Sequence, residues 1–96
     1  MAQLQIKPKS AANLTILIKS ALENQMMLID FGIAKTERKL KDLESEFGMS
    51  SRTFYEKFNQ GKLGDDFEYL RWAGEYETLQ RLKRDYDALR DIELCS

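Results

Sequence analysis

The only proline of this 96-residue chain is Pro8, so no later residue breaks a helix by lacking a backbone N–H. Beyond about Ser10 the apolar residues recur three and four positions apart, which is the spacing of one face of an α-helix. This spacing is sustained over more than three heptads with one polar member, Thr36. It predicts a long helix over about residues 10–47. The positions on this face are Leu22, Met26, Ile29, Ile33, Thr36, Leu40, Leu43 and Phe47.

Gly32 is the weak point of this predicted helix, because a glycine in a helix interior costs about 1 kcal/mol relative to alanine. The surrounding segment, residues 26–33, is apolar nearly all round, and a helix that is apolar on several faces is buried on several faces. We expect either one continuous helix that passes through a protein interface or a break near Gly32. Because this segment is too apolar to face water in a monomer, we also expect a homodimer. The candidate dimer-interface residues are Met26, Ile29, Ile33 and Leu40.

Glycines and aromatic residues mark the end of the first helix and a short second one. Gly48 suits the left-handed position that ends many helices, and Ser50, or Ser51 after it, can cap the next helix with its side-chain oxygen. That helix is expected over residues 51–60. The rings in and before it form a dense cluster that predicts a hinge core. The members of this core are Phe47, Met49, Phe54 and Phe58.

A third helix is expected over about residues 65–94. Asp65 can cap it, with Glu68 three residues later in a capping-box-like arrangement. Two long amphipathic helices with a short one between them make an antiparallel hairpin. The expected fold is therefore all-α, a single helical domain over residues 1–96 that forms a dimeric helical bundle. The apolar face of the third helix consists of Trp72, Leu79, Leu82, Tyr86 and Leu89.

The composition argues against catalysis. The chain has no histidine and a single cysteine, Cys95, which leaves no Ser–His or Cys–His pair, no zinc ligand set and no disulfide within the chain. We expect no enzyme activity, no cofactor and no bound metal. No stretch approaches the ~20 apolar residues that a membrane span needs, so we expect a cytoplasmic protein without membrane contact.

Charge is divided unevenly between the two halves of the chain. Residues 1–41 carry a net charge of +4 and residues 42–96 a net charge of −5, although the whole chain is nearly neutral at −1. An acidic half favours docking onto a basic partner. Two solvated helical faces would give the same pattern, because exposed charge is common.

A distinctive set of glycine, aromatic and acidic residues lies between Leu40 and Leu82. It comprises Phe47-Gly48-Met49, Phe54, Phe58, Gly61, Leu63-Gly64-Asp65, Trp72 and Tyr76. In these residues the chain resembles small all-helical proteins that are common in cyanobacteria and archaea. Many of those proteins look like antitoxins, encoded beside a small toxin in two-gene modules. The resemblance covers a little under half of the chain.

This resemblance implies a non-enzymatic protein that binds and neutralises a small, typically basic toxin by laying amphipathic helices over it. The partner-binding candidates are then Tyr69, Trp72 and Tyr76, because buried aromatic anchors carry much of the energy of such interfaces. The alternative for Trp72 and Tyr76 is ordinary core packing between the helices, since a row of rings at helical spacing usually packs.

Two other functions remain open. Leu4 and Ile6 alternate with polar residues before Pro8, so residues 1–9 are either a flexible tail or a very short strand. As a strand they would suit a small dimeric DNA-binding regulator that reads the groove with its N-terminal segment. The remaining alternative is a purely structural helical dimer.

Overall fold

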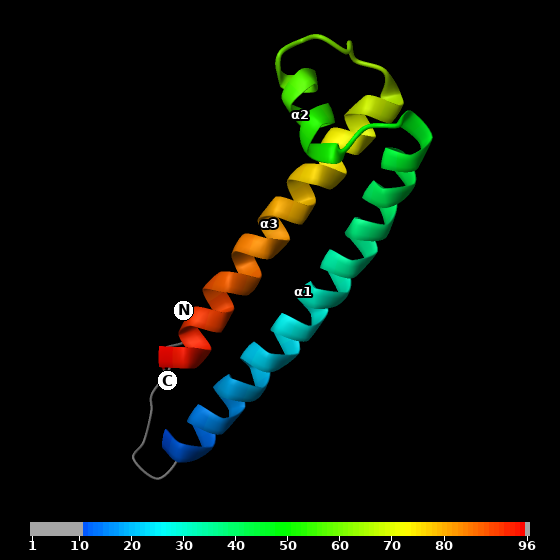
Figure 1. Cartoon of the computed structure of the whole chain (residues 1–96). Helices are drawn as coiled ribbons and strands as arrows, with labels where there is room; N and C mark the ends of the chain where they lie inside the picture. Colours follow the sequence, from blue (N-terminus) through cyan, green and yellow to red (C-terminus); the bar gives the residue numbers. More distant parts are fainter. Residues whose placement is uncertain (1–10, 96) are drawn as a thin grey trace.

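The computed structural model describes residues 11–95 and contains three helices and no strand in that part of the chain (Figure 1). The helices are α1 (Ala11–Phe47), α2 (Ser51–Asn59) and α3 (Phe67–Cys95). The all-α prediction is confirmed, and each expected helix end lies within two residues of the observed one. The tail or strand expected over residues 1–9 lies outside the described residues.

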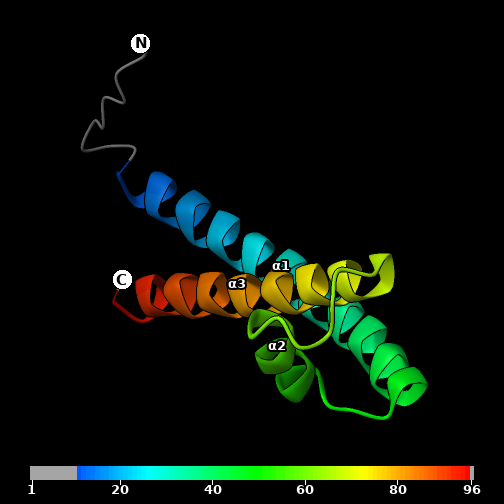
Figure 2. The ribbon, with the colours of Figure 1, turned by 90° about the horizontal axis from the view of Figure 1, so that it is seen from above.

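The two long helices, α1 and α3, pack as an antiparallel hairpin, and α2 lies beside the end at which the chain turns back (Figure 1). Seen from above, α1 and α3 cross at an angle, with α2 on one side of the crossing (Figure 2). The molecule is elongated, with principal extents of 60 × 27 × 20 Å. A helix rises ~1.5 Å per residue, so the 37 residues of α1 account for most of the long dimension.

The face predicted for residues 22–47 is the face that α1 turns toward α3. All eight predicted members are buried or half-buried. The predicted positions of α3 are covered in the same way, and Trp72 and Leu79 are the most deeply buried of them. The periodicity therefore identified the surface along which both long helices pack. The most deeply buried members on α1 are Ile29, Thr36, Leu40 and Leu43.

Helix α1 is continuous through Gly32, so the expected alternative of a break is not realised. A Cβ atom at this position would lie 3.3 Å from Cδ1 of Leu82 on α3. The two long helices thus approach closely at a residue that has no side chain. This close approach to Leu82 gives the glycine a packing role that offsets part of its helix-propensity cost.

Glycines with a left-handed backbone end both α1 and α2. Gly48 has a φ of 65° and Gly61 a φ of 73°, a region that glycine adopts without strain. Beyond Gly48, the N–H of Met49 donates to the carbonyl oxygen of Glu44 over 3.3 Å. This is the long hydrogen bond of the Schellman motif, and the chain after Gly61 repeats it. The helix end predicted at Gly48 is confirmed.

The predicted cap of α2 is confirmed, whereas the predicted cap of α3 is displaced. Ser50 Oγ accepts a hydrogen bond from the N–H of Thr53 over 3.1 Å. Helix α3 begins at Phe67, and the carbonyl oxygen of Asp66 accepts its first backbone hydrogen bond, over 2.9 Å. Asp66 therefore holds the cap position, and the prediction of Asp65 was wrong by one residue. Two adjacent aspartates are equally suited to capping, so their side chains do not distinguish the two positions.

Candidate protein-interaction surfaces

Trp72 lies at the centre of the core. Its side chain is fully buried, and its ring stacks on Phe54 with 3.9 Å between centroids and 6° between planes. The indole N–H donates to Oγ of Ser51, which is itself buried, over 2.9 Å. A side chain enclosed in this way cannot contact a partner. The prediction of Trp72 as a binding anchor was wrong, and the alternative of core packing is right.

The predicted hinge core forms around this tryptophan. Phe47 stacks on Trp72 with 5.4 Å between ring centroids, and Phe58 stacks on Phe54 at 5.6 Å. Met49 packs against the same cluster. The rings come from all three helices, so this cluster fixes α2 to the turn-back end of the hairpin.

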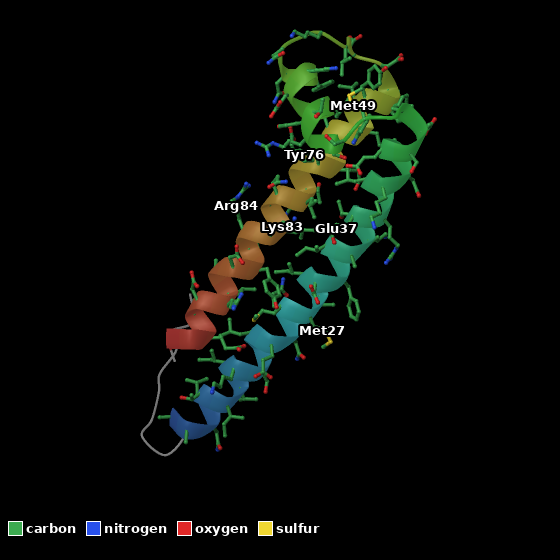
Figure 3. All side chains as sticks on the ribbon, in the orientation of Figure 1. Met27, Glu37, Met49, Tyr76, Lys83 and Arg84 are labelled. Atoms are coloured by element: carbon green, nitrogen blue, oxygen red, sulfur yellow. The ribbon has the colours of Figure 1, made fainter. Side chains whose placement is uncertain are left out.

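Tyr69 and Tyr76 are half-buried at the edge of this core. Tyr69 contacts both Phe47 and Phe54, with centroid distances of 5.6 and 5.7 Å. Tyr76, near the turn-back end of α3, packs on Tyr55 at 4.8 Å (Figure 3). Both rings use part of their surface for intramolecular packing, so only their remaining edges are open to a partner.

A hydrogen bond between side chains joins α2 to α3 beside Tyr76. The hydroxyl of Tyr55 donates to Oε1 of Glu77 over 2.8 Å. This bond raises the pKa of Tyr55 above its ordinary value of 10.0, because ionisation would remove the donor and place a second negative charge next to the carboxylate.

The residues predicted for a dimer interface lie inside the hairpin. Ile29 and Leu40 are buried, with exposed fractions of 6% and 4%. Met26 and Ile33 are half-buried on the same face of α1. Since α3 of the same chain covers this face, these four residues pack within the hairpin. A heptad pattern shows which side chains share a face but not which helix covers it.

The opposite side of α1 carries large apolar side chains that no described part of the chain covers. Met27 points away from α3 (Figure 3), and Phe31 is 66% exposed. We call this surface the outer face of α1. It is defined by Ile16, Leu17, Met27, Leu28 and Phe31, each of which is more than half exposed.

A second exposed apolar surface lies at the start of α3. Phe67 is the most exposed large apolar side chain of residues 11–93, at 76%, and Leu70 follows one turn later at 51%. Asp65 and Asp66 come directly before Phe67, and all three are exposed. Glu68 accepts a hydrogen bond from Arg71 over 3.0 Å. We call the surface formed by residues 65–70 the acidic tip.

A groove between α1 and α3 extends the acidic tip along the hairpin. It is lined on α1 by Asp42 and Glu46 and on α3 by Arg71 and Glu75. Lys39 on its wall forms an ion pair with Glu75, with 3.4 Å between Nζ and Oε1. Carboxylates outnumber cations along the groove, so it continues the negative charge of the tip.

No protein-family model, curated protein or solved structure matches this chain. In the described part of the chain no three Asp, Glu or Cys side chains are grouped as a metal ion would require. None of the three helices, over the residues described, combines the length and apolarity needed to cross a membrane. The outer face of α1 and the acidic tip are the candidate functional surfaces.

Proposed function

We propose that this protein is a non-enzymatic interaction module of the antitoxin type, a cytoplasmic homodimer that binds and neutralises a small basic toxin protein. The observation that carries the proposal is the acidic tip, where Phe67 and Leu70 face water beside carboxylates. Contiguous exposed apolar residues rimmed by polar ones mark interaction sites in soluble proteins. The tip also lies within the stretch from Leu40 to Leu82 that resembles antitoxins.

The acidic tip offers a basic partner both an anchor and an attractive field. An exposed ring such as Phe67 can enter a pocket of the partner, where a fully desolvated aromatic side chain contributes strongly to affinity. The carboxylates around it complement a positive surface, which accelerates encounter and orients the partner. A toxin held in this way would have its active surface covered by the amphipathic helices of the hairpin.

The core beneath the tip holds its backbone in place before binding. Tyr69 packs on Phe47 and Phe54, and Trp72 is enclosed by the same cluster. Both residues lie within two turns of Phe67. The anchor therefore projects from an ordered helix, and binding costs less conformational entropy than it would from a mobile loop.

An affinity purification from the lysate of the protein's own host, followed by mass spectrometry, tests the proposal. We expect one small basic protein at near-equal stoichiometry. Recovery of the protein only with itself would contradict the antitoxin function and favour a structural dimer. Recovery of DNA in place of a protein partner would favour a DNA-binding regulator.

Substitutions within α3 identify the surface used. The double variant Phe67→Ser/Leu70→Ser should lose the captured protein, and capture should also weaken as salt rises, because salt screens exposed charges. The matched control is Ile92→Ser, since Ile92 is another exposed apolar residue of the same helix, at 53%. Equal loss from the control, or undiminished capture by the double variant, would exclude the acidic tip as the binding surface.

A further inference from the structure

The outer face of α1 has a heptad repeat of its own. Six positions from Leu17 to Ala34 follow one another at spacings of three and four residues, as the a and d positions of a coiled coil do. Phe31 on this repeat and Ile29 on the buried face are about 200° apart around the helix, so the two faces lie on opposite sides of α1. The repeat consists of Leu17, Ser20, Asn24, Met27, Phe31 and Ala34.

No charged residue interrupts this second repeat. Between residues 11 and 34 the charged residues are Lys19, Glu23 and Asp30, and each lies at another helical position. The large apolar members of the repeat are more than half exposed. An uncharged face of this length that exposes Leu17, Met27 and Phe31 is a surface for another helix of the same kind.

We infer that the outer face of α1 pairs with the same face of a second copy, as a parallel, in-register, two-stranded coiled coil over residues 17–34. The inference rests on the homodimer within the proposed function and assigns its surface and orientation. Helix α3 covers the opposite side of α1, so each protomer can present the outer face while its hairpin stays intact. The four long helices then lie in the order α3, α1, partner α1, partner α3.

The charges that flank the repeat select a second copy in parallel orientation. Asp30 lies at a g position and Lys35 at the e position five residues later, and in a parallel coiled coil these two positions meet across the interface. Asp30 and Lys35 are exposed, and neither has an ion pair within the described part of the chain. In an antiparallel pair, g positions face g positions, which would bring Glu23 and Asp30 together with like charges of the other copy.

Asn24 occupies an a position at the middle of the repeat and is exposed in the single chain. A single buried Asn at an a position sets register and oligomeric state in coiled coils, because its amide is satisfied only by the amide of the partner strand. In the parallel dimer each Asn24 faces its counterpart. Ser20 and Ala34, small residues at d positions, let the two helices approach closely at both ends of the repeat.

The mass of the purified full-length chain in solution, measured by light scattering over a dilution series, is the first test. We expect a dimer, and we expect Phe31→Glu to raise its dissociation constant by about tenfold or more, since it places a charge at an a position inside the interface. Phe67→Glu is the matched control, because it changes an exposed phenylalanine outside the repeat and should leave the dimer intact. Far-UV circular dichroism of both variants confirms that the hairpin is folded. A monomeric wild-type protein would overturn the inference.

Disulfide trapping tests the orientation. In a Cys95→Ser background, Ala34→Cys should form a disulfide-linked dimer under mild oxidation, because equivalent d positions are adjacent in a parallel pair. Ala88→Cys, another exposed alanine but on α3, is the matched control and should remain monomeric on a non-reducing gel. Cross-linking of Ala34→Cys only when it is mixed with Leu17→Cys would show an antiparallel pair, in which a positions face d positions, and would overturn the orientation.

Charge reversal tests the pairing of Asp30 with Lys35 of the second copy. Asp30→Lys or Lys35→Asp alone should weaken the dimer by about twofold to fivefold, the range of exposed ion pairs. The double variant should restore the wild-type dissociation constant. Additive effects in the double variant would contradict the pairing. A protein that dimerises as described but captures no basic partner would leave this inference standing and contradict the antitoxin function instead.

Discussion

The turn-back end of the hairpin and the N-terminal half of α1 are both rich in large apolar side chains, but they are covered to very different extents. At the turn-back end three helices surround Phe54 and Trp72, so both side chains are fully buried. In the N-terminal half of α1 a single helix, α3, covers one face, and Leu28 on the outer face is mostly exposed, at 63%. The apolar content of a segment therefore does not fix how far its side chains are buried. The number of neighbouring helices in the same chain decides whether all of its apolar faces are covered.

The largest expected effect is on stability at the turn-back end of the hairpin. Trp72→Ala should lower the free energy of unfolding by about 3–5 kcal/mol, the cost of removing a large buried ring and leaving a cavity. The control Phe67→Ala removes an exposed ring five residues earlier and should change this free energy by less than about 0.5 kcal/mol. Urea denaturation followed by far-UV circular dichroism measures both. Similar losses from the two variants would show that burial does not separate the core from the acidic tip.

The next effect concerns the hydrogen bond that holds Trp72 in place. Ser51→Ala leaves the buried indole N–H without its acceptor and should cost about 1–3 kcal/mol of unfolding free energy. Ser45→Ala, at an exposed serine of α1, is the control and should be nearly neutral. A neutral result for Ser51→Ala in the same denaturation experiment would mean that the core at the turn-back end tolerates water beside the indole.

Much of the fold could be predicted from local rules. The spacing of three and four residues from Leu22 to Phe47 identified the buried face of α1, because a helix that packs along its whole length needs an apolar side chain at every turn. Gly48 and Ser50 were predicted at a helix end and a cap, since each residue type satisfies a specific backbone requirement there. Asp65 was mistaken for the cap because Asp66, one residue later, has the same capping chemistry.

The candidate surfaces could be predicted less well, because exposure depends on residues distant in the sequence. Trp72 is buried only because Ser51 and Phe54 of α2 fold onto it. Phe67 escaped prediction since it lies off the apolar face of α3, although an aromatic residue directly after two aspartates is a visible signal. Phe31 is not among the positions predicted for the buried face of α1, but the sequence alone did not show that α3 leaves it uncovered.

Gly32 lies between the N-terminal half of α1 and the turn-back end of the hairpin. Its replacement by alanine tests how tightly α3 packs against α1 at this position. Gly32→Ala should raise the free energy of unfolding by less than about 1 kcal/mol, because the gain in helix propensity is reduced by the shift required of Leu82. Gly74→Ala is the matched control, since no atom lies within 4 Å of its Cβ position, and it should show the full gain. Thermal denaturation at one protein concentration compares the two, and equal gains would mean that the helices separate freely at Gly32.

The smallest expected effect is a loss of stability at alkaline pH that arises at the turn-back end of the hairpin. The pKa of Tyr55 is higher in the folded chain than in the unfolded chain, chiefly because its hydroxyl donates to Glu77. The folded state thus holds the proton more tightly than the unfolded state. The stability that this hydrogen bond contributes is therefore fully present below the ordinary pKa of 10.0 and is lost as the pH rises above it. Tyr55→Phe should lower stability by less than about 1 kcal/mol at neutral pH, since the bond is exposed to solvent, and should abolish this part of the alkaline decline. Denaturation at pH values below and above the ionisation of Tyr55 measures the change in the free energy of unfolding, with Tyr86→Phe as the control. An unchanged alkaline decline in Tyr55→Phe would show that this bond contributes nothing to holding α2 on α3.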